Sequence, residues 1–222
     1  MCLFSSLSLI LFSSSAIAQE TIDIGSLKNT EIKVVQKILY NKAGKSEMGA
    51  HFGLMPFDAY TITPKLDFTY GQHLDETLMW EGGVGLGYGF KNGTFSELEG
   101  PSYGITPDAY RYLSSVHASM QYSPIYAKMT YDGARILHHD VYFLGGASLT
   151  IEQAFMEDAT IAVSPGISLG GGARIFLPNG NIIRVQLKDD IIFQERAKTA
   201  LVQGIYLKQN MTISVGYTLL RK

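Results

Sequence analysis

The alternation of apolar and polar residues around the turn Pro178 to Asn181 constrains the fold of this chain most strongly. Side chains alternate between the two faces of a β-strand, so the segment after this turn has one apolar and one charged face. Asp189 is the one exception on the apolar face. The apolar face carries Ile183, Val185, Leu187 and Ile191, and the charged face carries Arg184, Gln186, Lys188 and Asp190.

The same alternation recurs along the chain without helices that could cover the apolar faces. A closed barrel with lipid outside and polar groups inside satisfies this pattern. We therefore predict an all-β fold, an eight-stranded antiparallel transmembrane β-barrel of the outer-membrane type. The expected strands are 46–55, 61–71, 78–90, 116–130, 139–150, 161–176, the second half of the 174–192 hairpin, and 205–220.

Connection lengths give the barrel a predicted orientation. The connections after the second, fourth and sixth expected strands are short, and those after the third, fifth and seventh are longer. Bacterial barrels keep short turns on the periplasmic side and long loops outside. The loop 91–114 is therefore expected outside, with a helical turn or two that begins at Thr106 and Pro107. The first and last strands must pair, because unpaired edges are costly in hydrocarbon.

The N-terminus indicates export. Residues 1–18 are predicted to be a signal peptide with the cleavage pattern Ala16-Ile17-Ala18, although no Lys or Arg precedes its apolar core. An ordinary buried segment is the alternative. We expect 19–44 to be a periplasmic segment that plugs or flanks the barrel mouth, and 45–222 to be the barrel. The expected location is the outer membrane of a Gram-negative bacterium. Removal of residues 1–18 would also remove Cys2, the one cysteine.

Composition excludes several partner classes. With 18 basic and 20 acidic residues, the chain lacks the basic excess typical of nucleic-acid binding. No stretch approaches the roughly 20 apolar residues of a membrane helix. Nothing in the sequence predicts a cofactor or a metal site. The predicted partners are outer-membrane lipids and further copies of the chain.

Three stretches carry a resemblance to a known family. The quoted motifs are Tyr122 to Met129, His139 to Gly146, and Gly172 to Leu177 followed by Ile183 to Asp189. Together they resemble the outer-membrane β-barrel domain proteins of predatory and gliding bacteria, which include proteins linked to adventurous gliding motility. The likeness covers most of the chain after residue 34. It implies the barrel and supplies no catalytic residues, since it consists of strand and turn patterns.

Equal numbers of acids and bases are expected on the inward faces. Buried charges are costly unless they are paired, so the first interpretation is a salt-bridged plug that fills the lumen. A narrow ion path is the alternative, although eight strands scarcely leave room for water. The predicted network contains Glu47, Asp67, Glu81, Asp140 and Asp190 with Lys65, Lys128, Arg174, Arg184 and Lys188.

Histidines raise the possibility of catalysis. His138 and His139 are neighbours on one strand and therefore face opposite ways, so they cannot share a metal ion there. His51 is expected in the lumen near the outer rim, where Ser114 or Ser115 could serve as a nucleophile. A polar lumen histidine explains His51 equally well, and we predict no enzyme.

Small residues on the expected outer face suggest an interface. Gly145, Ala147, Gly171 and Ala173 would form a smooth strip that a neighbouring copy could pack against. The predicted function is a structural or interaction role in the cell envelope, as a possible lipid-enclosing homo-oligomer. A narrow porin-like channel and, less favoured, a lipid-modifying enzyme are the alternatives. Tyrosines in loop 91–114 could be adhesion sites or interfacial anchors.

Overall fold

The computed structural model describes residues 41–131, 135–155, 159–195 and 204–221. The predicted signal peptide and the predicted periplasmic segment up to residue 40 lie outside these residues. Residues 41–44, the end of that segment, are described and lead directly into the first strand.

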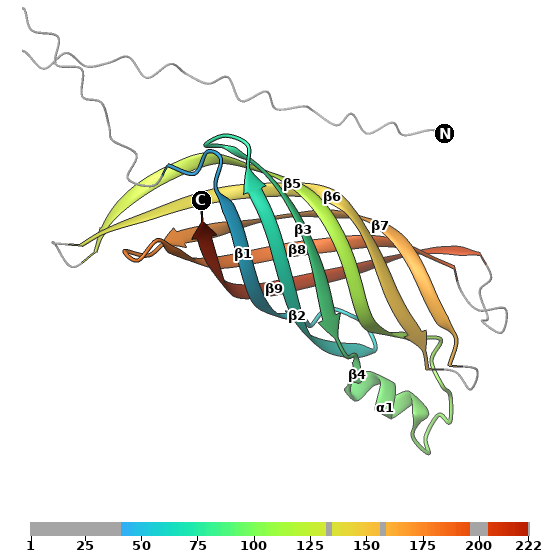
Figure 1. The fold of residues 1–222 in the computed structure, drawn as a ribbon. Helices are drawn as coiled ribbons and strands as arrows, with labels where there is room; N and C mark the ends of the chain where they lie inside the picture. Colours follow the sequence, from blue (N-terminus) through green and yellow to red (C-terminus); the bar gives the residue numbers. More distant parts are fainter. Residues whose placement is uncertain (1–40, 132–134, 156–158, 196–203, 222) are drawn as a thin grey trace, which may run out of the picture. The chain divides into compact units, whose positions relative to one another are not determined.

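Antiparallel strands close into a ring in the described part of the chain (Figure 1). The ring runs β1-β9-β8-β7-β6-β5-β3-β2 and returns to β1, so the predicted eight-stranded barrel is confirmed. The two-residue strand β4 is an addition that pairs with the start of β2. The strands are β1 (Ser46–Met55), β2 (Thr61–His73), β3 (Leu78–Gly87), β4 (Phe90–Lys91), β5 (Tyr110–Tyr131), β6 (Arg135–Ala154), β7 (Ile161–Phe176), β8 (Asn181–Glu195) and β9 (Ile205–Arg221).

The first and last strands of the ring pair as the sequence predicted. Antiparallel pairing of β1 with β9 extends from Ser46 opposite Arg221 to Leu54 opposite Ile213. The β9 segment from Ile205 to Thr212 continues beyond β1 and has its described strand partner in β8 alone. The ring is therefore closed over the length of β1 and open on one side of β9 beyond it.

Strands β5 and β6 are longer than the sequence predicted. Their pairing starts at Tyr110 opposite Ala154 and contains irregularities between Tyr112 and Ser114 and between Tyr122 and Ile125. Strand prediction relies on a two-residue period. Each irregularity breaks this period, because an extra residue reverses the face to which the following side chains point. The start of β5 before Ser114 was therefore invisible to simple alternation, whereas the part of β5 beyond Ile125 lies within the expected strand 116–130.

The helix in loop 91–114 is not where the sequence predicted it. Helix α1 spans Gly93–Glu99, and the side chain of Asn92 caps it by accepting a hydrogen bond from the N–H of Phe95 at 3.0 Å. Residues near Thr106 form no helix, because the chain soon continues into β5, which begins at Tyr110 and pairs with β6. Within the described residues, no helix is long and apolar enough to cross a membrane.

The barrel has two rims, which we name by their contents. The terminal rim contains the start of β1, the end of β9 and the turns 74–77 and 177–180. The helix rim contains the loop 56–60 and residues 92–109 with α1 (Figure 1).

In the turn 74–77, one Asp75 oxygen accepts hydrogen bonds from the N–H of Thr77 at 2.6 Å and of Leu78 at 2.7 Å. These backbone hydrogen bonds, with one from the Thr77 hydroxyl, lower the pKa of Asp75.

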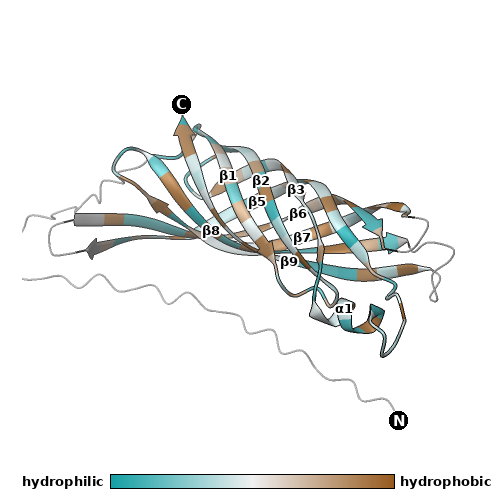
Figure 2. Cartoon of the chain, turned by 90° about the horizontal axis from the view of Figure 1, so that it is seen from below, coloured by the Kyte–Doolittle hydropathy of each residue, from teal (hydrophilic) through white to brown (hydrophobic). Residues whose placement is uncertain are grey.

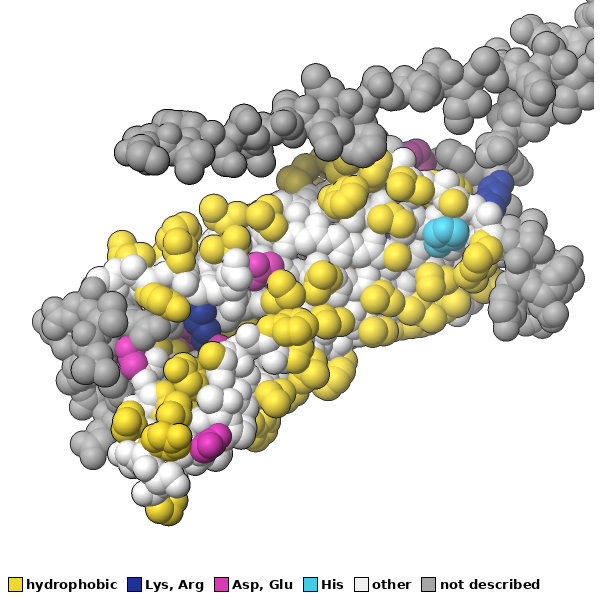
Figure 3. Space-filling view, turned by 180° about the vertical axis from the view of Figure 1, so that it is seen from behind, with side chains coloured by type: hydrophobic (Ala, Val, Ile, Leu, Met, Phe, Trp, Pro, Cys, Tyr) yellow, Lys and Arg dark blue, Asp and Glu magenta, His cyan; other side chains and the backbone are white. Residues whose placement is uncertain are grey.

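The strands separate an apolar exterior from a polar interior. Hydropathy alternates along the strands in Figure 2, and apolar side chains are spread over the outer surface in Figure 3. An apolar exterior of this kind is the surface that a membrane barrel presents to lipid. The exposed outward residues include Phe52, Leu66, Phe68, Val84, Leu86, Val116, Phe143, Leu149, Ile167, Leu169, Val185, Leu187, Ile213 and Val215.

A charge placed on this exterior should destabilise the barrel in lipid. Val215 faces outward between Phe52 of β1 and Val185 of β8. We expect Val215→Arg to lower the free energy of unfolding by about 2 kcal/mol, because an arginine must leave water near the bilayer centre. Urea unfolding of the protein refolded in phosphatidylcholine vesicles measures this. Val215→Leu is the matched control, and an equal loss for both variants would contradict a lipid-facing position.

Candidate functional site

The lumen is the candidate site, because charged side chains from every part of the ring converge there. Of the ten residues in the predicted lumen network, nine have buried side chains within the barrel. The structure brings them together in three groups along the lumen. The nine are Glu47, Lys65, Asp67, Glu81, Asp140, Arg174, Arg184, Lys188 and Asp190.

One ion pair spans the lumen from wall to wall. Arg184 on β8 donates both terminal nitrogens to Glu81 on β3, and the Nη2 to Oε1 distance is 3.0 Å. Strands β8 and β3 are four positions apart in either direction around the ring. The pair therefore joins opposite walls of the barrel, and both side chains are almost completely buried.

Arg174 organises the second group, toward the terminal rim. Its guanidinium lies 3.5 Å from Asp140 and 3.6 Å from Glu47, and it also donates to Gln121. Glu47 in turn lies 2.7 Å from the Nε2 atom of His73. Four strands of the ring, β1, β5, β6 and β7, are thus connected through one side chain.

A tyrosine lies against both arginines. Arg174 and Arg184 are direct cross-strand neighbours in the β7–β8 register, and like charges at such positions repel. The Tyr142 ring centre lies 4.3 Å from the Arg174 guanidinium carbon and 4.9 Å from that of Arg184. The Tyr142 hydroxyl also accepts a 2.7 Å hydrogen bond from Arg184 Nε. Cation–π contacts and separate carboxylates thus offset the repulsion.

Two lysines form the third group, toward the helix rim. Lys65 lies 3.1 Å from Asp67, and Lys188 lies 3.3 Å from Asp190. The described lumen near Lys188 retains a cavity of about 10 Å³, which also borders His51 and Asp67. That volume holds about one water molecule. Side chains therefore leave room for about one water molecule at this level of the lumen.

Glycines on the inward faces make this filling possible. A Cβ atom added at Gly216 would overlap the ring of His51, and one at Gly83 would lie 2.7 Å from the ring of His117. The predicted role of inward glycines, to make room for long neighbours, is therefore seen for these two histidines. For Arg184 itself, the nearest Cβ conflicts do not involve its side chain.

One predicted member of the lumen network, Lys128, does not lie in the lumen. Its side chain is exposed, because Lys128 lies on β5 beyond Tyr122, the last residue of β5 that pairs with β3. The hairpin β5–β6 extends past the terminal rim there, so an inward-facing position no longer lies inside the lumen. The difference in length between β5 and its neighbour β3, which the alternation did not predict, decides this position.

Lys42 is a lumen residue that sequence reasoning missed. It precedes β1, yet its side chain is buried, and Nζ lies 2.7 Å from Asp140 Oδ2. Its ammonium also lies near the rings of Tyr126 and Phe176. Lys42, just before β1, thus reaches into the mouth of the barrel. No strand pattern could single out Lys42, because it lies outside a strand.

The side chains considered for catalysis are engaged elsewhere. His51 is buried in the lumen with Nε2 3.1 Å from the Thr69 hydroxyl, and the Ser115 hydroxyl lies 2.7 Å from that of Tyr112. Ser114 and Ser115 belong to β5 and not to a loop, contrary to prediction. His138 Nδ1 lies 2.8 Å from the Tyr126 hydroxyl. The described residues therefore show no hydrogen-bonded serine and histidine pair at these positions.

The small outward residues do not form a continuous strip. In the β6–β7 register, Gly145 lies opposite Leu169 and Ala147 opposite Ile167. Gly171 and Ala173 lie opposite Phe143 and Val141, respectively. Each small residue therefore has a large cross-strand neighbour, and the strip is interrupted. The homo-oligomer stays a prediction without this feature to support it.

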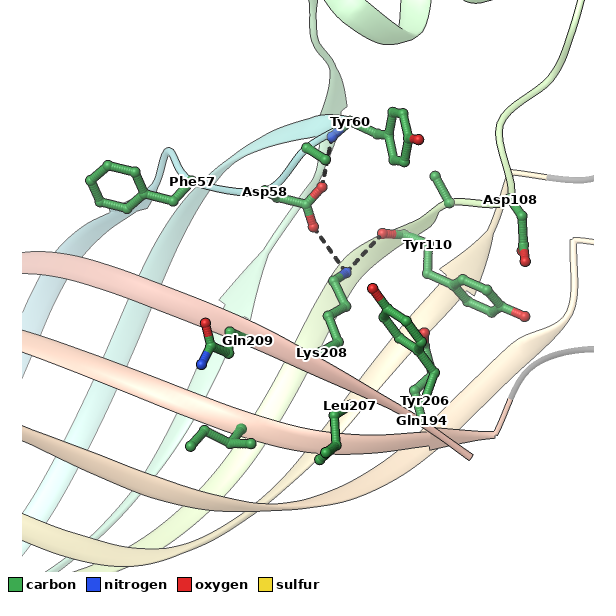
Figure 4. A pocket seen from close by; sticks show the side chains of 13 residues that line it. Phe57, Asp58, Tyr60, Asp108, Tyr110, Gln194, Tyr206, Leu207, Lys208 and Gln209 are labelled. Carbon is green, nitrogen blue, oxygen red and sulfur yellow. Dashed lines mark hydrogen bonds and ion pairs between the residues drawn. The ribbon is translucent and has the colours of Figure 1, made fainter. Parts of the chain in front are cut away.

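A pocket of about 380 Å³ opens at the helix rim (Figure 4). Lys208 of β9 lies at its base, with Nζ 3.0 Å from Asp58 Oδ2 and 3.0 Å from Glu152 Oε1. The Asp58 carboxylate also accepts hydrogen bonds from the N–H groups of Tyr60 and Thr61, which fixes the loop 56–60. No sequence pattern predicts this pocket, because its residues come from four separate segments.

Comparison with known proteins gives structural likeness only. No family model and no curated protein matches the chain. The N-terminal β-barrel domain of Pseudomonas aeruginosa OprF is similar, with 9% identity, a TM-score of 0.47, and coverage of 80% of this chain and 98% of that one.

Two further solved structures are similar at the same level. Neisserial surface protein A has 11% identity, a TM-score of 0.44, and coverage of 79% of this chain and 94% of that one. Ail, the attachment invasion locus protein of Yersinia pestis, has 11% identity, a TM-score of 0.39, and coverage of 80% and 99%. The assignment as an outer-membrane-type barrel rests on this chain's own strand register, apolar exterior and charged lumen.

Breaking the pair that spans the lumen should be costly. We expect Glu81→Gln to lower the free energy of unfolding by about 3 kcal/mol, because it leaves Arg184 buried without a carboxylate. Glu99→Gln is the matched control in the exposed Lys91–Glu99 pair and should cost less than about 1 kcal/mol. The double variant Glu81→Leu with Arg184→Met should recover most of the loss. Urea unfolding in lipid measures all three, and equal values for the two Gln variants would contradict the role of this pair.

Proposed function

We propose that this protein is a closed outer-membrane barrel with a structural or interaction role in the cell envelope. The observation that carries the proposal is the Arg184–Glu81 pair, which joins opposite walls of the lumen. Arg174 and its partners fill the next level of the lumen, and both lysine pairs fill the level beyond. A lumen filled in this way favours rigidity over transport.

In this role, the rims and the outer surface are the parts of the barrel that contact other envelope components. The helix rim carries the longer connections, helix α1 and the pocket, so it offers the larger variety of side chains. By the rule that long loops lie outside, we propose that this rim faces the cell exterior and that the terminal rim faces the periplasm. A homo-oligomer, a lipid-enclosing assembly and membership of the gliding-motility family stay predictions.

A porin-like channel is the alternative, and conductance tests it. We expect the wild-type protein to show no steady conductance in planar bilayers, because a ring of eight strands leaves inward space for little beyond side chains and the Arg184–Glu81 pair crosses it. Glu81→Ala with Arg184→Ala should give a measurable conductance, since it removes the pair that crosses the lumen. Lys91→Ala with Glu99→Ala deletes an equal pair of charges at the exposed surface and should stay silent. Steady conductance of the wild type would support the channel instead.

Orientation can be tested with single cysteines, because Cys2 is the one cysteine in the chain. Thr94 is exposed on α1 at the helix rim, and Asn179 is exposed in a turn of the terminal rim. We expect a membrane-impermeant maleimide to label Thr94→Cys on intact cells and Asn179→Cys only after the outer membrane is permeabilised. The reverse pattern would invert the proposed orientation. Labelling of both variants in detergent extracts is the control for reactivity.

A further inference from the structure

The third group of lumen charges, toward the helix rim, is connected differently from the other two groups. Lys65 pairs with Asp67 two residues further along β2, and Lys188 pairs with Asp190 two residues further along β8. Each of these ion pairs therefore stays on one strand and does not join opposite walls of the barrel. The cavity of about 10 Å³ in this part of the lumen is bordered by both Asp67 and Lys188.

Polar atoms on three residues that border this cavity lack hydrogen-bond partners among the described residues. The atoms are Thr212 Oγ1, His117 Nδ1 and Lys188 Nζ, and the last has only its ion-pair contact with Asp190 at 3.3 Å. The three side chains are between 2% and 6% exposed, so bulk water does not solvate them. A polar group buried without a partner is destabilising, and a small cavity lined by several such groups is where proteins hold ordered water.

The strands that carry these atoms lie on opposite sides of the lumen. Thr212 is on β9 and His117 is on β5, and these strands are four positions apart around the ring in either direction. Thr212 and Lys188 are direct cross-strand neighbours in the β8–β9 register. His117 therefore faces the β8–β9 pair from the opposite wall, and Asp67 of β2 borders a third side of the cavity.

The size and the lining of the cavity select water over an ion or a larger ligand. A probe-sized volume of about 10 Å³ holds about one water molecule. The Asp67 carboxylate disfavours an anion at this position. In the part of the chain that the structure describes, no three His, Cys, Asp or Glu side chains are grouped so that they could hold a metal ion. Water can both donate to a carboxylate and accept from an ammonium, which this lining requires.

We propose that this cavity binds one ordered water molecule that joins β9 to β5 across the lumen. The water accepts hydrogen bonds from Lys188 and Thr212. It donates to Asp67 and to Nδ1 of His117, which then carries its proton on Nε2. A bridging water is nearly as favourable as a direct hydrogen bond. The water thus connects opposite walls at a level where both lysine ion pairs stay on their own strands.

Two isosteric variants test the bridge in full-length protein refolded in phosphatidylcholine vesicles. Thr212→Val and Thr218→Val each remove a buried hydroxyl that has no partner among the described residues, and of the two only Thr212 borders the cavity. We expect Thr212→Val to lower the folding equilibrium constant about fivefold, because the water loses one hydrogen bond. Thr218→Val should leave the constant unchanged or raise it, since no hydrogen bond is lost.

Urea unfolding measures both constants, and heat-modifiable migration on gels checks that both variants fold. A dry cavity predicts the same result for the two variants, because each hydroxyl would then lack a partner. Equal changes, or a larger loss for Thr218→Val, would therefore overturn the proposal.

Crystallography of the wild-type protein, with bromide as the halide in the crystallisation solution, identifies the occupant directly. We expect one electron-density peak within hydrogen-bond distance of Thr212 Oγ1, His117 Nδ1 and Lys188 Nζ, without anomalous signal at the bromine edge. An anomalous peak would identify a halide, and the absence of any peak would identify a dry cavity; either result overturns the proposal. Neither experiment measures conductance, so the water site can fail while the closed-barrel proposal stands, and the reverse is also possible.

Discussion

Charge pairing inside a narrow lumen is the constraint on which the rest of this structure depends. A ring of eight strands leaves inward space for little beyond side chains. An arginine buried there without a partner would destabilise the barrel by several kcal/mol, as would a buried carboxylate. Arg184 meets Glu81 from the opposite wall, and Arg174 meets Glu47 and Asp140. The interior therefore includes contacts between strands that are not neighbours in the ring, from Arg184 to Glu81 and from Arg174 to Glu47.

The exterior is constrained instead by contact with hydrocarbon. In hydrocarbon, backbone groups must be bonded within the protein, which is why β1 and β9 pair and why outward side chains are apolar. Two features depart from this rule at the same place. Pairing of β1 with β9 stops short of the start of β9, and Asp189 places a carboxylate on the apolar face nearby. Departures from a strong physical rule are where a function is to be sought.

The ion pairs in the lumen and the pocket at the helix rim are separate structural features. The first joins opposite walls and opposes flow along the barrel axis. The second lies where the wall is incomplete and faces lipid from the side. A barrel of this kind can be mechanically rigid and still present a binding surface in the plane of the membrane.

The sequence by itself determined the class of fold, the ring closure and most lumen residues, because a two-residue period assigns each side chain to the inside or the outside. It did not determine which charges meet, since Arg184 and Glu81 are 103 residues apart and their contact depends on the number of strands between them. It also misplaced the helix of loop 91–114, because β5 already begins at Tyr110, and the side chain of Lys128, because β5 extends beyond the end of its pairing with β3 at Tyr122. Only the tertiary structure assembled the helix-rim pocket, whose walls come from four segments that share no period.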